Sequence, residues 1–273
     1  MKIDKSKIKA IAIGRFDGLH LAHFELIKRL GENGALVIIK DSKPKLTPKR
    51  EDYLKIPCFY YKIEDIKHLS GEEFIQILKD EFVNLEKIVV GYDFEFGFNR
   101  AWKAKNIKEF FKGEVEIVDE FFLNKVSVHS KLIRSMLESG DIKGANELLG
   151  RKYFIKGEVV KGQGLGAKEL FATLNLDVKD YFLPKEGVYA TLCMVNNKAY
   201  KSVSFIGHRV STDGEFSIET HILDDFCDVM ATEAKVEFVK FIRDNAKFTS
   251  LKALKEQIKS DIAQAKQALE SEN

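Results

Sequence analysis

Over the first half of the chain, short apolar runs alternate with segments in which apolar residues recur at helical spacing. The apolar runs have the length and composition of buried strands and lie at residues 8–13, 35–39, 87–90 and 115–118. Helical patterns lie at residues 20–30, 71–82 and about 130–137, and a further helix should begin after Asp141 and end before Gly150. Strands that alternate with helices are typical of a parallel sheet with crossover helices, so we predict a doubly wound α/β domain.

After Gly150 the pattern changes to strands of alternating polar and apolar residues joined by short polar turns. Candidate strands lie at residues 153–160, 187–195, 198–206, 217–223 and 234–243, with Asn196-Asn197 as a hairpin turn. Closely spaced strands of this kind predict a β-barrel. Apolar residues then recur every three or four positions between Leu251 and Leu269, so a last helix should pack one face on the barrel. We therefore predict two domains, residues 1–150 and 151–273.

Composition and charge fit an ordinary globular protein. The 273 residues carry 44 Lys and Arg against 42 Asp and Glu, a net charge of +2, so no basic field indicates nucleic-acid binding. The three cysteines have neither metal-ligand nor disulfide spacing, which fits a reducing cytosol. The apolar run before Gly14 is too short for a signal peptide, and no stretch is long enough to cross a bilayer. We expect a soluble cytoplasmic protein that binds neither nucleic acid nor membrane, while the oligomeric state stays open.

The junction between the first strand and the first helix carries the most informative residues. Here the chain places Gly14, the turn Phe16-Asp17-Gly18, and then His20 and His23. A glycine turn that leads into a helix presents backbone N–H groups and the positive helix end, and two imidazoles add further donors. Such a site suits the phosphate chain of a nucleotide and predicts nucleotidyl transfer. Taken alone, a histidine pair three residues apart could equally cap or pack a helix.

Several motifs in order resemble those of the bacterial bifunctional riboflavin kinase and FMN adenylyltransferases, also called FAD synthetases. The first is G-x-F-D-G-x-H-x-G-H, in which Ala22 replaces a glycine. The second, V-V-G-x-D-F-x-F-G, matches residues 89–97 and places Asp93 and Phe94 after a predicted strand, at the usual ligand edge of a parallel sheet. The resemblance implies that Asp93 and Phe94 seat the flavin or its phosphate. The alternative is an aspartate in a turn beside packed phenylalanines.

A third motif, S-S-T-x-I-R, is matched in part by residues 129–134, where Ser130 and Arg134 agree and Lys131 replaces a threonine. A lysine supplies charge but not the geometry of a hydroxyl. The resemblance implies attack of the FMN phosphate on the α-phosphate of ATP, with release of pyrophosphate. In that reaction the implied catalytic residues are His20, His23 and Arg134, and the implied nucleotide-binding residues are Gly14, Phe16, Asp17, Gly18 and Ser130.

The second half of the chain resembles the riboflavin kinase module of the same family. A glycine-rich stretch with Gly162, Gly164 and Gly166 leads into Leu170-Phe171-Ala172-Thr173-Leu174-Asn175, where the family has G-F-P-T-A-N. The resemblance implies that the three glycines bind the nucleotide. It also implies a magnesium site at Thr173, with Asn175 as a supporting contact two residues along on the same face of a strand.

Glu219 lies in a block that resembles the family's V-E-x-H-x-L-D, where the glutamate is the general base. Strand alternation places Glu219 opposite the face of Ile218 and Thr220, so its side chain should be available to substrate. A lone glutamate on a strand is more often simply solvent-facing. The resemblance implies a six-stranded barrel with a terminal helix that makes FMN from riboflavin with ATP and Mg²⁺, and a nucleotidyltransferase domain that makes FAD from FMN.

A competing hypothesis is a degenerate paralogue that keeps one activity, or binds flavin or nucleotide without turnover. It is favoured by departures inside the phosphate and flavin motifs, namely Ala22, Lys131, Leu170, Ala172 and Val210.

Overall fold

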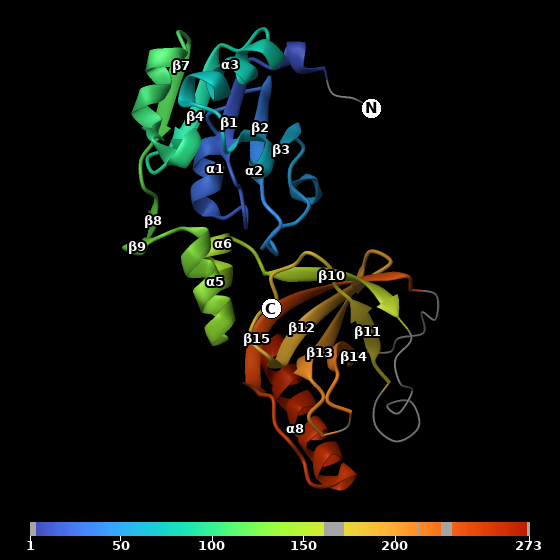
Figure 1. The fold of residues 1–273 in the computed structure, drawn as a ribbon. Coiled ribbons are helices and arrows are strands. Elements are labelled where there is room, and N and C mark those ends of the chain that lie inside the picture. Colours follow the sequence, from blue (N-terminus) through green and yellow to red (C-terminus); the bar gives the residue numbers. More distant parts are fainter. Residues whose placement is uncertain (1–3, 161–171, 212, 225–230, 272–273) are drawn as a thin grey trace. The chain divides into compact units, whose positions relative to one another are not determined.

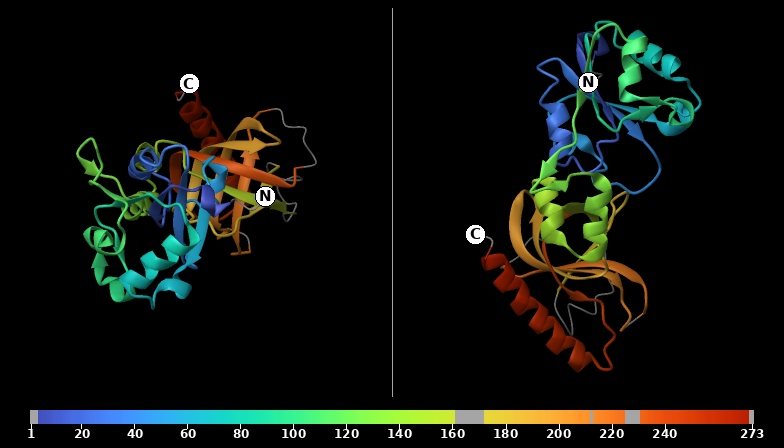
Figure 2. Two further views of the ribbon diagram at one scale, coloured as in Figure 1. Left: turned by 90° about the horizontal axis from the view of Figure 1, so that it is seen from above. Right: turned by 90° about the vertical axis from the view of Figure 1, so that its left-hand side faces the viewer.

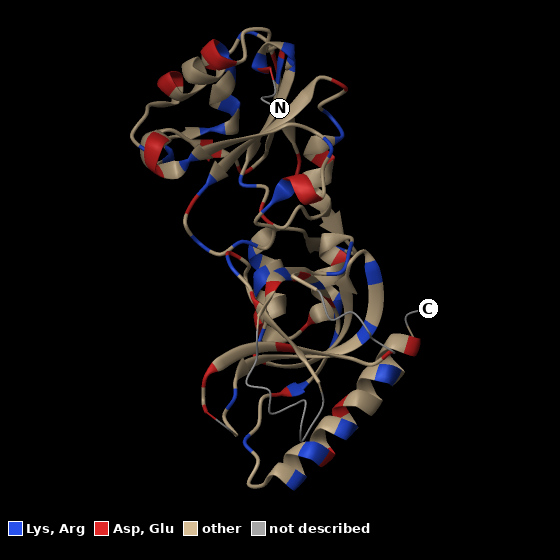
Figure 3. Ribbon diagram, turned by 90° about the vertical axis from the view of Figure 1, so that its right-hand side faces the viewer, with Lys and Arg blue, Asp and Glu red and all other residues tan. Residues whose placement is uncertain are grey.

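The computed structural model describes residues 4–160, 172–211, 213–224 and 231–271. The chain forms two compact units, Met1–Ser130 and Lys131–Asn273 (Figure 1). Residues of both charges are interspersed along the ribbon of each unit (Figure 3), in keeping with the small net charge.

The first unit is built on a five-stranded parallel sheet in the order β3-β2-β1-β4-β7. The strands are β1 (Ala10–Gly14), β2 (Gly34–Lys40), β3 (Cys58–Lys62), β4 (Lys87–Gly91) and β7 (Glu114–Val118), and the helices are α1 (Leu21–Ile27), α2 (Ile63–Ile66), α3 (Gly71–Glu81) and α4 (Ile107–Phe110). Four predicted strands and the two predicted helices of this region are confirmed, whereas β3 was not predicted.

Each face of this sheet has its own apolar core, as a doubly wound fold requires. On one face Ile11 and Ile13 of β1 pack with Phe74 and other residues of α3. On the other face Ala12 packs with Leu26 of α1. Strand alternation therefore divides β1 between two cores, and the predicted fold class of this unit is confirmed.

Short elements precede the first strand and lie in the connections between the longer strands and helices. They are the two-residue strands β5 (Glu95–Phe96), β6 (Trp102–Lys103), β8 (Phe122–Leu123) and β9 (Val126–Ser127), and the 3₁₀ turns η1 (Lys5–Lys7), η2 (Arg50–Asp52), η3 (Phe98–Arg100) and η4 (Ala104–Asn106).

The second unit contains a closed barrel in the order β10-β11-β14-β13-β12-β15. The strands are β10 (Phe154–Val160), β11 (Leu174–Asp177), β12 (Gly187–Val195), β13 (Lys198–His208), β14 (Phe216–Ile222) and β15 (Glu233–Asp244), and the helices are α5 (Ser130–Ser139), α6 (Ile142–Leu149) and α8 (Leu251–Glu270). Asn196 and Asn197 both have positive φ, 49° and 63°, as a tight hairpin turn requires. The predicted barrel and terminal helix are confirmed.

Strand alternation divides the barrel residues between an inner and an outer face. Buried hydroxyls form a line across three strands on the inner face: Thr191 Oγ1 lies 2.8 Å from Ser202 Oγ and 2.8 Å from Ser204 Oγ, and Ser204 Oγ lies 2.8 Å from Thr220 Oγ1. On the outer face, Val188 and its neighbours pack against α8, which runs along the outside of the barrel (Figure 2).

Helix α6 is tied to the barrel through Asn146. Its side-chain amide donates to the carbonyl oxygen of Phe238 at 2.9 Å, and its side-chain oxygen accepts from the amide of Tyr153 at 2.6 Å. Asp141 caps the start of α6, and Gly150 ends it with a φ of 68°. The compact units thus divide at Ser130, and α6 packs with the barrel although it precedes the module boundary predicted at residue 150.

Candidate functional site

The turn between β1 and α1 has an unusual backbone. Phe16, Gly18 and Leu19 have positive φ values of 47°, 95° and 43°. Only glycine adopts this region without strain, so two of the three residues are held there by their surroundings. The side chains of Phe16 and Leu19 are fully buried, and their packing in the core fixes the turn.

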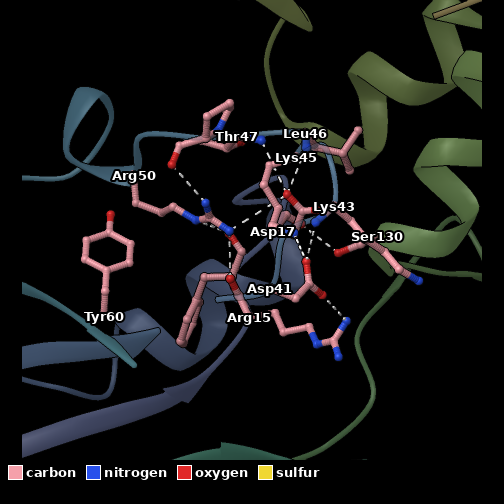
Figure 4. Close-up of polar contacts among 12 residues, drawn as sticks. Arg15, Asp17, Asp41, Lys43, Lys45, Leu46, Thr47, Arg50, Tyr60 and Ser130 are labelled. Atoms are coloured by element: carbon pink, nitrogen blue, oxygen red, sulfur yellow. Dashed lines mark hydrogen bonds and ion pairs between the residues drawn. The ribbon is translucent and has the colours of Figure 1, made fainter. Parts of the chain in front are cut away.

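A buried arginine, Arg50, makes hydrogen bonds to the backbone of this turn (Figure 4), although nothing in the sequence singles it out. The Arg50 guanidinium donates to the carbonyl oxygens of Phe16 at 3.2 Å, Arg15 at 2.9 Å and Pro48 at 3.1 Å. Its Nη2 lies 3.9 Å from a carboxylate oxygen of Asp17, which accepts from the amide of Leu46 at 2.8 Å. Burial lowers the pKa of Arg50, whereas the nearby Asp17 charge opposes that change.

The two histidines of the first motif lie together at the end of the turn. The rings of His20 and His23 stack with centroids 3.6 Å apart and planes 18° from parallel, and the His20 ring is buried. His20 occupies the N-cap position of α1, but its side chain makes no capping hydrogen bond. The structure therefore disfavours capping as the role of this residue and brings both imidazoles to one place.

Ser130 lies in the same site. Its hydroxyl donates to the backbone carbonyl of Asp17 at 2.6 Å, which holds Ser130, the last residue of the first unit, against the turn (Figure 4). Gly14 leaves room for Phe16, because a Cβ there would lie 3.3 Å from the Phe16 ring. Arg134 belongs to the second unit, where its guanidinium carbon lies 4.4 Å from the centroid of the Phe182 ring.

The second motif has a structural role beside any functional one. Asp93 is exposed in the turn after β4, whereas Phe94 stacks on Phe96, with centroids 5.6 Å apart, and packs on the core. A Cβ at Gly97 would lie 2.4 Å from the Trp102 indole. This glycine is therefore required for packing. Among the fixed positions of the motif Asp93 is the exposed one, and Tyr92 and Glu95 at its variable positions are exposed as well.

In the barrel, Asn175 and Glu219 are direct cross-strand partners on β11 and β14. Direct partners in antiparallel strands project to the same face, with Cβ atoms about 5 Å apart. Thr220 next to Glu219 points into the barrel, so Glu219 and Asn175 lie on the outer face, as strand alternation predicts. The structure thus brings together two candidate residues that are 44 positions apart in the sequence.

Thr173 lies just before β11 and is held near β14 by His221. The Nδ1 of His221 lies 2.7 Å from the carbonyl oxygen of Ala172, to which it donates, so the backbone next to Thr173 is tied to the strand that carries Glu219. The predicted nucleotide-binding residues Gly162, Gly164 and Gly166 lie outside the described residues.

Glu219 is contacted by two groups that the sequence analysis did not identify. Its Oε1 accepts from the Ser217 hydroxyl at 2.9 Å and from Nη1 of Arg209 at 3.5 Å. The guanidinium of Arg209 also makes a two-pronged pair with Asp213, at 3.0 and 2.7 Å. The side chains of Arg209 and Glu219 are 19% and 25% exposed, so the carboxylate of the candidate base is partly buried but still reaches the surface.

The donor set on this face suits magnesium. Among the described residues, no three His, Cys, Asp or Glu side chains converge to hold a metal ion by themselves. Mg²⁺ is usually bound by one or two protein oxygens together with substrate phosphates. The hydroxyl of Thr173 and the amide oxygen of Asn175, beside a carboxylate, fit that kind of site.

Within the parts of the chain that the structure describes, we find no helix that combines the length and the apolar character needed to cross a membrane.

Comparisons with known proteins match both units. The riboflavin kinase family model matches residues 149–269. The bifunctional riboflavin kinase/FMN adenylyltransferase of Bacillus subtilis is 30% identical, over 96% of this chain and 93% of the relative, and that of Listeria monocytogenes is 29% identical, over 93% and 90%. A crystal structure from Streptococcus pneumoniae, described as a macrolide-efflux protein, superposes with a TM-score of 0.82 at 26% identity, over 93% of this chain and 92% of that one.

Proposed function

The chain belongs to the bifunctional riboflavin kinase/FMN adenylyltransferase family, and from this premise we propose how its residues divide the two reactions. The enzyme phosphorylates riboflavin to FMN with ATP and then adenylylates FMN to FAD with release of pyrophosphate. We assign the first reaction to residues 151–273 and the second to residues 1–150. A cytoplasmic location is proposed on the chemistry, because both reactions consume ATP.

The observation that carries the kinase assignment is the pairing of Asn175 with Glu219 on the outer face of the barrel. Glu219 is the general base, which accepts the proton of the ribityl 5′-hydroxyl as that oxygen attacks the γ-phosphate of ATP and ADP leaves. Thr173 and Asn175 would hold Mg²⁺. When bound, the ion neutralises charge on the phosphate oxygens.

In the nucleotidyltransferase unit, His20 and His23 donate hydrogen bonds to the phosphates of ATP while the FMN phosphate attacks the α-phosphorus. The nucleophile is already ionised, so the protein needs no general base and acts by positioning two anions and stabilising charge. The strained turn from Gly14 to Gly18 and the hydroxyl of Ser130 shape this site. Arg134 is proposed to bind phosphate, and Asp93 with Phe94 to seat the flavin.

One time course tests these assignments. Purified protein is incubated with riboflavin, ATP and Mg²⁺, and the flavins are separated at intervals. FMN that appears first and is then converted to FAD supports both assignments. FMN without FAD would show that the adenylylation site is inactive. A second incubation starts from FMN instead of riboflavin, and FAD formed there but not from riboflavin would show that the kinase site is inactive. No product from either substrate would favour the degenerate paralogue.

A further inference from the structure

We propose that Ser217 and Arg209 are positioning residues, which hold one oxygen of the Glu219 carboxylate so that the other oxygen receives the proton of the substrate hydroxyl. The proposal rests on the role of Glu219 as the base of the kinase reaction and adds the groups that orient it.

Both contacts to this carboxylate go to the same atom. Oε1 accepts from the Ser217 hydroxyl and from Nη1 of Arg209, at 2.9 and 3.5 Å, and among the described residues the hydrogen bonds and ion pairs of this carboxylate all go to Oε1. The last torsion of a glutamate has broad, weakly defined minima, so an isolated carboxylate turns readily. Two donors on one oxygen remove that freedom and leave the second oxygen directed away from them.

The local fold explains why these groups meet. Ser217 and Glu219 are two positions apart on β14, so both project from its outer face. Arg209 follows β13 directly, and its backbone amide donates to the carbonyl oxygen of Glu215 at 2.9 Å. This bond closes the connection between the strands, so the Arg209 side chain returns over the start of β14.

Asp213 fixes the plane of the Arg209 guanidinium. Its two carboxylate oxygens accept from Nε and Nη2 at 3.0 and 2.7 Å, which leaves Nη1 to face Glu219. Two parallel bonds of this kind specify orientation as well as energy. Ser217 therefore supplies the shorter contact to the base, and Arg209 supplies a fixed positive charge.

The proton transfer balances with these groups in place. Oε2 of Glu219 takes the proton of the ribityl hydroxyl while the hydroxyl oxygen forms its bond to the γ-phosphorus and the bond from that phosphorus to the bridging oxygen of ADP breaks. The protonated carboxyl group then releases its proton to solvent. Ser217 and Arg209 keep their protons throughout, so neither is consumed or regenerated.

The test is a double-mutant cycle on FMN formation with Ser217→Ala and Glu219→Gln. A misplaced catalytic group commonly costs 10- to 100-fold in rate, so Ser217→Ala should lower kcat about 10-fold and change the KM values for riboflavin and ATP by less than about 2-fold. In the Glu219→Gln background the same change should alter kcat by less than about 2-fold, since no base remains to be oriented. Ser217→Thr, which keeps the hydroxyl, should restore most of the rate.

Arg209→Gln should also lower kcat, and Arg209→Lys should recover it in part, because lysine keeps the charge but not the two-pronged pair with Asp213. Ser260→Ala, at an exposed position on α8, is the matched control and should leave kcat unchanged. A Ser217→Ala enzyme with the wild-type kcat overturns the proposal. An equal loss of kcat on adding Ser217→Ala to the wild type and to Glu219→Gln also overturns it, because Ser217 would then have a structural role. Wild-type activity in Glu219→Gln alone would instead reject the base assignment itself.

Discussion

Replacing Arg50 by methionine should destabilise the first unit strongly. Methionine keeps an unbranched apolar stem, so the change removes mainly the guanidinium. That group donates to three backbone carbonyls around the turn at Phe16 and lies beside the Asp17 carboxylate, and the side chain is 2% exposed. Removing one partner from a buried charged cluster costs about 3–5 kcal/mol. Asp17 still accepts a hydrogen bond from the Leu46 amide, so its carboxylate is not left without a partner. We therefore expect the free energy of unfolding to fall by about 3 kcal/mol, the lower end of this range.

Urea unfolding followed by tryptophan fluorescence measures this loss in the right unit. The chain has one tryptophan, Trp102, and it lies in the first unit. With a urea dependence of about 1–3 kcal/mol per molar, a loss of about 3 kcal/mol lowers the midpoint by about 1–3 M. The rate of FMN formation, measured where the variant is still folded, should stay at the wild-type value.

Lys49→Met is the matched control, since Lys49 is the exposed neighbour of Arg50 in the same loop. A surface substitution of this kind changes stability by less than about 0.5 kcal/mol. If Arg50→Met and Lys49→Met had the same urea midpoint, the buried guanidinium would contribute nothing to the turn, and the account of how the histidines are presented would be wrong.

Three further changes probe the two sites and the second motif. Glu219→Gln should lower FMN formation about 10²-fold or more and leave the conversion of supplied FMN to FAD intact, as product separation would show; a wild-type kinase rate would contradict the assignment. Replacing His20 and His23 together by alanine should lower FAD formation at least ~10²-fold and spare the kinase, and undiminished FAD synthesis would make the pair structural. Gly97→Ala should cost more stability than Gly31→Ala. Both glycines have positive φ, 73° and 68°, for which alanine pays about 1–2 kcal/mol, but only the Cβ at Gly97 would collide with Trp102. Equal urea midpoints for the two variants would show that the indole yields at little cost.

The elements that the sequence predicts well are those whose signal is local. Asp141 and Gly150 mark the ends of α6 because a cap and a left-handed C-terminus depend on the residues next to them. Strand β3, which was not predicted, is an edge strand of the sheet with only half-buried and exposed residues, so its apolar signal is weak. Strand β11 has four residues and was expected only through the family resemblance.

Contacts between distant residues have no local signal. Arg50 reaches Phe16 across 34 positions, and nothing in the polar loop around it marks it as buried. The motif resemblance predicts Glu219 as the base, a role that stays a prediction. Ser217 and Arg209 are found only in the structure, where strand pairing brings them beside Glu219. The position of Asp93 follows from the strand before it, whereas the packing reason for Gly97 depends on Trp102, which comes later in the chain.

The line of buried hydroxyls inside the barrel has a consequence for how the chain pairs its strands. If β14 slipped by one residue against β13, Ser204 would lose Thr220 and the carboxylate of Glu219 would turn into the barrel interior. A charge there would cost far more than one hydrogen bond, so the polar line and the base together discriminate against the wrong pairing. Replacing the four hydroxyl residues of this line by alanine would keep the apolar residues inside the barrel, but would weaken the preference for the native register of β14 against β13. The buried hydroxyls inside the barrel thus favour the strand register that keeps Glu219, the proposed base, on the outer face.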